Sequence, residues 1–277
     1  MKIIVCIPAH LGSTRFPAKV LARDTGKYLV QHVWERACQA KLPQRVIIAA
    51  DDRRVIDAAE SFGAEAILTS PDLQSGTDRV AAAVENLDVD IVINLQGDEP
   101  EIEPANIDSL ATLMLENQDY QMGTLAAPFH NKQQIADPSI VKVVISSCVV
   151  RDVYCKKTKA QNTQYAIRNT QYGEAIYFSR SVIPYDRQAG GIGKVDNYLR
   201  HLGIYAYRKD FLLKITKLPQ SMLEKTECLE QLRVIENGYK ILVGIVEKDS
   251  DGIDTPDQYA QFVKRYKKFS TENKGKR

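Results

Sequence analysis

The first half of the chain alternates short apolar runs with segments of helical period. The apolar runs are continuous and rich in β-branched residues, which is typical of strands buried on both faces of a parallel sheet. We predict such strands at Ile3–Ile7, Val46–Ala50, Ala66–Leu68 and Ile91–Leu95. Between them we predict three helices: one with apolar positions Leu29, Val30, Val33, Trp34 and Ala37, one over Arg53–Phe62 and one over Thr77–Leu87. The pattern indicates an α/β fold that binds ligands at the carboxyl ends of its strands.

The middle of the chain, about residues 141–207, has a different pattern. Strand-like runs at Val141–Ile145, Ala175–Ser179 and Leu202–Tyr207 are separated by polar segments. They indicate mixed or antiparallel strands that extend the sheet and form a substrate lobe. The last part returns to a helix, a strand, a loop and a helix, at Cys228–Glu236, Ile241–Val246, Asp249–Thr255 and Pro256–Tyr266. We predict a single domain over residues 1–266 and a basic, disordered tail over residues 267–277.

The loop after the first strand carries the most informative chemistry. It contains a small, flexible turn, Gly12-Ser13-Thr14, and two cations, Arg15 and Lys19. Backbone N–H groups of such a turn can converge on phosphate oxygens, and the cations offset polyphosphate charge. The spacing matches neither a Walker A loop nor a Gly-x-Gly-x-x-Gly dinucleotide turn. It is similar to the loop of nucleotidyltransferases that join a sugar to a nucleoside phosphate, and the alternative is an ordinary polar connection.

Two acidic residues follow predicted strands. Asp98 comes just after Ile91–Leu95, where Gly97 lets the backbone approach a ligand closely, and a carboxylate there suits Mg²⁺. Asp254 precedes Thr255-Pro256 at a helix start, so its alternative role is that of a helix cap. Taken with Arg15 and Lys19, the two acids provide the parts that metal-assisted nucleotidyl transfer requires.

Composition and charge narrow the class of protein. The chain has 277 residues, 44% of them hydrophobic and 26% charged, which is typical of a globular protein, and the sequence contains no apolar run long enough to span a membrane. Five scattered cysteines without metal-site spacing favour reduced thiols in the cytoplasm. Seven Lys and Arg residues lie from Lys264 onward, which is typical of a solvated end, and we expect no nucleic-acid partner.

The ordered set of motifs along the chain resembles the CMP-Kdo synthetase family, the 3-deoxy-D-manno-octulosonate (Kdo) cytidylyltransferases. The resemblance extends from Ile3 to about Tyr266. It rests on Ile-Pro-Ala at 7–9, Ser-Thr-Arg at 13–15, Gln-His-Val at 31–33, Gln-Ser-Gly-Thr at 74–77, Asn-Leu-Gln-Gly-Asp-Glu-Pro at 94–100, Val-Lys-Val-Val at 141–144, Tyr-Phe-Ser-Arg at 177–180, His-Leu-Gly-Ile-Tyr at 201–205, Leu-Glu-Gln-Leu-Arg at 229–233 and Asp-Thr-Pro at 254–256.

The resemblance implies a Rossmann-like nucleotidyltransferase fold, with a mostly parallel mixed sheet flanked by helices and a smaller substrate or dimerisation lobe. It implies that CTP and Kdo give CMP-Kdo and pyrophosphate, for lipopolysaccharide synthesis, with Mg²⁺ as cofactor and a homodimer as the assembly. Lys19, Asp98 and Asp254 would be catalytic, the two acids also holding Mg²⁺. The implied nucleotide-binding residues are Ala9, His10, Gly12, Ser13, Arg15, Lys19, Ser75 and Gly76.

The implied sugar-binding residues are Gln96, Arg180, Tyr185, His201, Glu230 and Gln231. Two of the implied assignments have structural alternatives. Without its motif, His201 would be interpreted as a hydrogen-bonded core histidine. Ser75 and Gly76, taken alone, indicate only a capped helix.

The chain departs from the family pattern at three places. The family usually has Arg where His10 stands, so a fixed positive charge becomes pH-dependent. It usually has Gly where Ala18 stands. About two dozen extra residues, roughly 147–172, lie beside the substrate-lobe motif. A cytidylyltransferase for another acidic sugar is therefore the first alternative, and a non-catalytic nucleotide-sugar-binding regulator is the second.

Overall fold

The structure, a computed structural model, describes residues 1–13, 15–146 and 172–274, with side chains up to residue 269 in the last helix. The chain divides into two compact units. The first, which we call the terminal unit, comprises residues 1–107 and 250–277, and the second, the central unit, comprises residues 108–249. The predicted insertion lies outside the described residues except for its last position, Tyr172.

The terminal unit contains a parallel sheet whose strands are the apolar runs of the first half. The strands are β1 (Ile3–Ala9), β2 (Arg45–Ala50), β3 (Glu65–Leu68) and β4 (Ile91–Leu95), in the order β3-β2-β1-β4. The register pairs Cys6 with both Ile47 and Asn94, and every side chain of β1 is buried. All carboxyl ends of these strands therefore meet at one edge.

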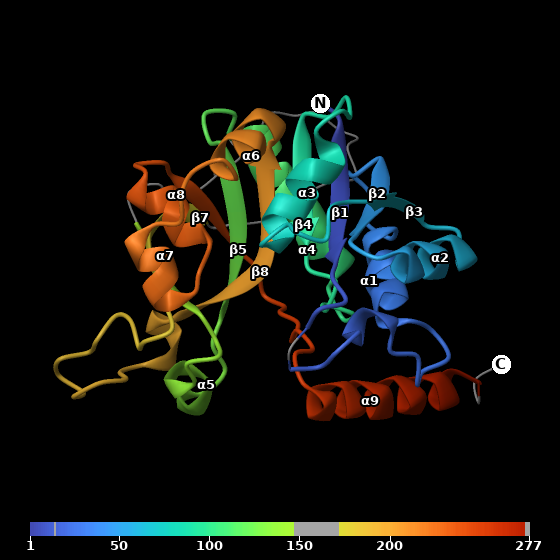
Figure 1. Ribbon diagram of the computed structural model, residues 1–277. Coiled ribbons are helices and arrows are strands. Elements are labelled where there is room, and N and C mark those ends of the chain that lie inside the picture. The colour runs from blue at the N-terminus through green and yellow to red at the C-terminus, as the bar shows by residue number, and fades with distance from the viewer. Residues whose placement is uncertain (14, 147–171, 275–277) are drawn as a thin grey trace, which may run out of the picture. The chain divides into compact units, whose positions relative to one another are not determined.

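Five helical segments accompany this sheet: η1 (Lys19–Leu21), α1 (Leu29–Ala37), α2 (Arg53–Ser61), α3 (Gly76–Val84) and α9 (Pro256–Lys274). The buried side chains of α1, α2 and α3 are mainly apolar. Helix α2 lies beside β2 and β3 (Figure 1). A further helix, α4 (Pro104–Glu116), contains the boundary between the two units. Within the described residues, no helix is long and apolar enough to cross a membrane.

The central unit has a mixed sheet. Its strands are β5 (Met122–Pro128), β6 (Lys142–Ser146), β7 (Tyr172–Ser179), β8 (Leu199–Arg208) and β9 (Ile241–Ile245), in the order β8-β5-β9-β7-β6. Among these described strands, only β5 and β9 are parallel, and an additional pairing of β6 with β8 joins the two ends of this order. The prediction of mixed or antiparallel strands is confirmed. The remaining segments are α5 (Lys132–Ala136), η3 (Val195–Asn197), α6 (Lys209–Ile215), α7 (Met222–Glu227) and α8 (Gln231–Glu236).

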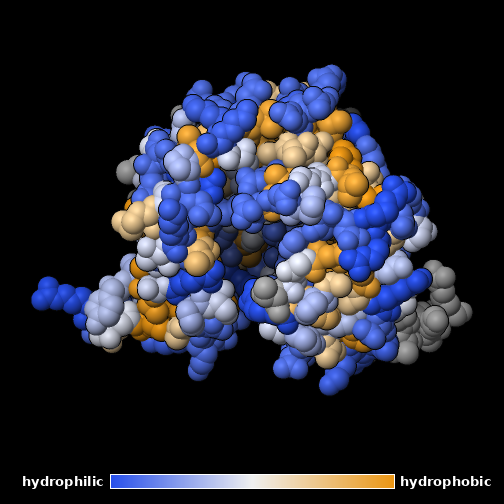
Figure 2. All heavy atoms as spheres, in the orientation of Figure 1, coloured by the Kyte–Doolittle hydropathy of each residue, from blue (hydrophilic) through white to orange (hydrophobic). Residues whose placement is uncertain are grey.

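Several boundaries differ from the sequence prediction by a few residues, and two of the differences have a clear physical reason. The helix predicted from Cys228 begins at Gln231, because Cys228 adopts a left-handed conformation (φ 53°) that ends α7. The last helix does not end before the basic tail but continues to Lys274, since Lys and Glu residues there are good helix formers. The face drawn in Figure 2 is largely hydrophilic with scattered apolar residues, as expected of a globular surface.

Candidate active site

Three segments of the terminal unit meet at the carboxyl end of β1. A methyl group added at Gly97 would lie 2.7 Å from the carbonyl oxygen of Pro8, so only glycine fits there without a backbone shift. At Gly76 the corresponding distance to the Pro8 ring is 3.4 Å. The loop after β4 and the start of α3 therefore both pack against the end of β1. This arrangement brings Ala9, the Ser75–Gly76 turn and the Gln96–Asp98 segment together, as the sequence predicts.

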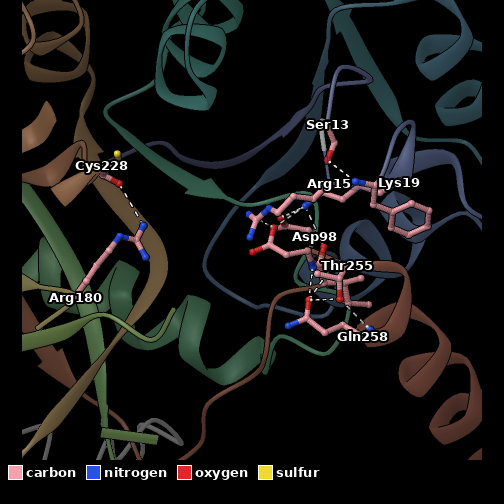
Figure 3. Close-up of polar contacts among 11 residues, drawn as sticks. Ser13, Arg15, Lys19, Asp98, Arg180, Cys228, Thr255 and Gln258 are labelled. Atoms are coloured by element: carbon pink, nitrogen blue, oxygen red, sulfur yellow. Dashed lines mark hydrogen bonds and ion pairs between the residues drawn. The ribbon is translucent and has the colours of Figure 1, made fainter. Parts of the chain in front are cut away.

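Lys19 connects the two acidic segments. Its Nζ donates to Asp98 Oδ2 at 2.6 Å, to the carbonyl of Ile253 at 3.0 Å and to Asp254 Oδ1 at 3.1 Å (Figure 3). The Lys19 side chain is only 12% exposed. Burial lowers its pKa, but the attraction of Asp98 and Asp254 outweighs burial and holds the pKa above its ordinary value. The ammonium is therefore charged at neutral pH and holds two carboxylates at one place.

Asp254 is available for this cluster because another residue caps the helix. Gln258 N donates to Thr255 Oγ1 at 3.3 Å, and Gln258 Oε1 accepts from the backbone N–H of Thr255 at 3.0 Å and of Asp254 at 2.8 Å (Figure 3). This is a capping box with Thr255 as the cap. The Asp254 carboxylate instead contacts Lys19 and, at 3.0 Å, Arg15 Nη2. Thr255, and not Asp254, therefore caps the helix.

The loop between β1 and η1 is held by its own backbone. Ala18 has φ 53° and ψ 28°, and its N–H donates to the carbonyl of Leu11 at 3.0 Å. Ser13 Oγ accepts from the Phe16 N–H at 3.4 Å. The guanidinium of Arg15 stays largely in solvent, since its side chain is 65% exposed. The loop thus presents one buried and one exposed cation beside the carboxylates.

His10 lies in this loop and pairs with a residue that the sequence analysis missed. Its Nδ1 contacts the carboxylate of Asp51, whose other oxygen accepts from the Leu11 N–H at 3.2 Å. Arg79, whose side chain is 2% exposed, has Nη2 3.7 Å from the Asp51 oxygen that His10 contacts, Oδ2. The imidazole also lies over Gly12, where an added methyl group would be 2.4 Å from Nε2. Asp51 directly follows β2, at the edge of the sheet where α/β folds bind ligands, and this position could have identified it from the sequence.

The start of α3 carries a short polar network. Ser75 Oγ caps the helix by accepting from the Asp78 N–H at 3.1 Å. Asn94 on β4 donates to Thr77 Oγ1 at 3.4 Å and accepts from Gln96 Nε2 at 3.1 Å. Ser75 therefore caps α3, which is the structural alternative that the sequence indicated for it. The backbone of Gly76 lies beside Gln96, since a methyl group added there would be 3.5 Å from Gln96 Oε1.

In the central unit, Arg180 follows β7 and carries an uncompensated charge. Nε donates to the carbonyl of Glu227 at 2.8 Å and Nη1 to that of Pro138 at 3.2 Å. Nη2 donates to that of Cys228 at 3.4 Å (Figure 3). No carboxylate of the described residues pairs with the guanidinium. Three carbonyls thus orient a cation that keeps its full charge for an anionic partner.

His201, Tyr205 and Gln231 form a second polar group in the central unit. His201 Nε2 contacts Thr124 Oγ1 at 3.0 Å, its ring lies 5.4 Å from that of Tyr205, and burial lowers its pKa to about 3. Tyr205 donates to Gln231 Oε1 at 3.2 Å, while Gln231 Nε2 is buried with no partner among the described residues. An unsatisfied buried donor is costly. The group therefore presents a donor suited to a ligand oxygen.

The predicted sugar-binding set is divided between the two units. Gln96 lies in the terminal unit, and the other five members lie in the central unit. Glu230 precedes α8 and is exposed, and Tyr185 is 66% exposed. The geometry of the central unit connects His201 with Gln231 through Tyr205. The role of these residues in sugar binding stays a prediction.

Comparison with known proteins decides the family. A family model described as cytidylyltransferase matches residues 4–241. The 3-deoxy-manno-octulosonate cytidylyltransferase of Solibacter usitatus is 42% identical over 266 residues, which cover 96% of this chain and 95% of that protein. That of Thermodesulfovibrio yellowstonii is 43% identical over 267 residues, covering 93% and 95%. The chain belongs to the 3-deoxy-manno-octulosonate cytidylyltransferase family.

Solved structures agree with this cytidylyltransferase assignment. A CMP:2-keto-3-deoxy-manno-octonic acid synthetase complexed with CTP superposes with a TM-score of 0.81 at 38% identity, covering 98% of this chain and 100% of that one. A cytidylyltransferase from Leptospira borgpetersenii, at 17% identity and a TM-score of 0.54, shares the fold. The predicted family, nucleotidyltransferase fold and enzyme class are confirmed.

The residues of this cytidylyltransferase fit a magnesium ion shared with a substrate. Asp98 and Asp254 both contact the ammonium of Lys19, so two carboxylates converge where a cation already stands. Mg²⁺ usually binds through one or two carboxylates together with substrate phosphates and water. Among the residues described, no cluster of three or more His, Cys, Asp or Glu side chains could hold a metal ion. A site of two acids would be completed by the nucleotide.

Proposed function

We propose that this enzyme transfers the cytidylyl group of CTP to Kdo, giving CMP-Kdo and pyrophosphate for lipopolysaccharide synthesis. The observation that carries the proposal is the near full-length similarity to relatives of that name and to a CTP-complexed synthetase. The sugar's anomeric hydroxyl would attack the α-phosphorus, forming the new P–O bond as the bond to pyrophosphate breaks. Catalysis would rest on positioning and charge neutralisation.

The terminal unit would bind CTP. Arg15 and Lys19 supply two cations for the triphosphate, and the Gly12–Ser13 turn supplies N–H groups. The Ser75–Gly76 turn would read cytosine, since it lies beside Gln96 at the end of β4. Asp98 and Asp254 would hold Mg²⁺, which when bound adds positive charge beside the reacting phosphate.

The central unit would bind the sugar acid. Arg180 offers a guanidinium that has no carboxylate partner among the residues described, which suits the sugar's carboxylate. Gln231 Nε2 offers a buried, unsatisfied donor for a hydroxyl, and His201 and Tyr205 connect to it. Glu230 and Tyr185 would contact the sugar from the exposed side. A homodimer and a cytoplasmic location, both implied by the family, belong to the same proposal.

A sugar panel tests the proposed function. The full-length enzyme is incubated with CTP and Mg²⁺ and with Kdo, a Kdo variant or another ulosonic acid, and pyrophosphate release is measured. We expect the highest kcat/KM with Kdo. A preference for another acidic sugar would support the first alternative, and CTP binding without turnover on any sugar would support a regulator. An Asp98→Asn enzyme provides the background rate.

A further inference from the structure

Lys142 on β6 is a buried cation that the proposed chemistry does not use. The residue is 0% exposed. Its Nζ donates to three backbone carbonyls: that of Arg180 at 2.6 Å, that of Ile140 at 2.8 Å and that of Asp137 at 2.9 Å. These contacts satisfy all three donors of an ammonium. Burial lowers the pKa of Lys142. Keeping a charge inside a protein is costly, so the buried ammonium of Lys142 depends on these three hydrogen bonds.

Each of the three carbonyls belongs either to Arg180 or to the turn of residues 137–140, one of the segments that contact its guanidinium. One is the carbonyl of Arg180 itself. The other two flank Pro138 in the turn after α5, and the Pro138 carbonyl accepts from Arg180 Nη1 at 3.2 Å. Lys142 therefore fixes both the main chain from which the guanidinium projects and the turn that holds one of its ends.

The neighbouring charged groups are already occupied. The Asp137 carboxylate accepts from the Ser139 N–H at 2.8 Å and from its hydroxyl at 2.7 Å. Glu227 accepts from Ser179 Oγ at 2.6 Å and from the Arg180 N–H at 3.0 Å. Both acids thus bind main chain and hydroxyl groups, so neither neutralises Arg180 or Lys142 by direct contact. Within the described residues, the guanidinium of Arg180 thus has no carboxylate partner, which favours an anionic ligand.

We propose that Lys142 is a positioning residue that holds Arg180 in place to receive the carboxylate of the sugar substrate. The inference rests on the proposed function, because Arg180 must first bind the sugar. Since misplacement of a binding group by about 1 Å can cost on the order of a hundredfold, moving Arg180 should weaken sugar use. CTP use depends on groups of the terminal unit and should be spared.

The test compares the Michaelis constants for the two substrates in matched variants. Lys142→Met removes the donors, Lys142→Gln keeps two amide hydrogens, and Lys142→Arg keeps the charge. Arg208→Met is the control, because Arg208 also donates to two carbonyls, those of Met114 at 2.9 Å and Tyr120 at 3.2 Å. We expect Lys142→Met to raise KM for Kdo roughly ten- to a hundredfold with KM for CTP unchanged, Lys142→Gln to raise it less, and Arg208→Met to alter neither.

A double-mutant cycle with Arg180→Gln tests the positioning role of Lys142 separately from the sugar-binding role of Arg180. If Lys142 acts through Arg180, Lys142→Met has no further effect on KM for Kdo in the Arg180→Gln enzyme. Additive effects, or equal increases in KM for Kdo and CTP, would overturn the positioning role. An unchanged KM for Kdo in Arg180→Gln alone would instead overturn the proposed sugar site. If Lys142→Met does not fold, Lys142→Gln and Lys142→Arg replace it in the same double-mutant cycle.

Discussion

Asp98 and Asp254 both contact Lys19, but they differ in burial. Substituting each one can therefore distinguish an effect on turnover from an effect on the free energy of unfolding. The perturbation is Asp98→Asn or Asp254→Asn, which removes one negative charge and keeps the side-chain size. The Asp98 side chain is 24% exposed and lies 2.6 Å from Lys19, which is 12% exposed. The Asp254 side chain is 42% exposed and lies 3.1 Å from the same ammonium. Asp98 therefore makes the shorter and more buried contact.

The two stability costs should differ. A hydrogen bond to a charged group is worth about 1.5–3 kcal/mol, so Asp98→Asn should lower the free energy of unfolding by about 2 kcal/mol. Exposed ion pairs contribute about 1 kcal/mol or less, so Asp254→Asn should cost about 0.5 kcal/mol. Turnover should not follow this order. Loss of one stabilising group at the reacting phosphate costs about 3–4 kcal/mol, which is a factor of 10²–10³ in kcat for both variants.

The assay measures pyrophosphate release with saturating CTP and Kdo over a Mg²⁺ titration, beside urea denaturation of each variant. Asp257→Asn is the matched control, since Asp257 is an exposed acid in the first turn of α9, three residues after Asp254. It should retain turnover and stability. Near-normal kcat in either Asp98→Asn or Asp254→Asn at moderate Mg²⁺ would refute the two-carboxylate mechanism. So would losses of turnover that simply track the losses of stability.

Three other predictions follow from the site and the core. CTP should be strongly preferred over ATP and GTP, because the proposed reading of cytosine by backbone groups of the Ser75–Gly76 turn, which packs close to Pro8, suits a pyrimidine and not the larger purine. Comparable kcat/KM with ATP would contradict this, and discrimination against UTP should be weaker. His10→Arg should lower KM for CTP by adding a fixed charge, and an unchanged KM would mean that His10 serves only its contact with Asp51. Burial lowers the pKa of His32 to about 4 and that of His201 to about 3. Both folded values lie below the unfolded value of about 6.5, so this contribution to stability is complete above pH 6.5 and is lost as the pH falls toward 3–4. Urea denaturation at pH 7 and pH 5 should show a loss of about 2 kcal/mol for each histidine, and His32→Gln should reduce the difference.

The parallel half of the fold could be predicted because its strands are continuous apolar runs. The predicted strand Ile91–Leu95 is observed with the same bounds, and the helix predicted over Arg53–Phe62 is one residue shorter. The strand Met122–Pro128 was not predicted. Its sequence, Met-Gly-Thr-Leu-Ala-Ala-Pro, consists mainly of small residues with low strand propensity. Pairing with β8 and β9 stabilises it, and such long-range pairing has no local signal.

At the candidate site, the residue types could be predicted but not the partners. The sequence places Lys19 more than seventy residues from Asp98, and only the folded chain brings their side chains into contact. The helix cap had a signal that the sequence analysis did not use: Thr255 and Gln258 have the spacing of a capping box. For Arg79 the sequence contained no such signal, because a cation in the buried face of a helix is not expected until its partner Asp51 is known.

Of the two departures within the nucleotide loop, Ala18 preserves the loop and His10 changes its chemistry. A non-glycine residue in the left-handed region costs about 1 kcal/mol, and here backbone bonds on both sides hold it there: Ala18 N–H to Leu11 at 3.0 Å and Leu21 N–H to Ala18 at 2.9 Å. Alanine also restricts the unfolded chain more than glycine does, which offsets part of that cost. The turn at Ala18 still directs Lys19, the next residue, into contact with both carboxylates. No similar compensation replaces the fixed charge at His10, whose ring is held by Asp51 instead. His10 is therefore the departure from the family pattern at which triphosphate binding in this enzyme should differ from that of its relatives.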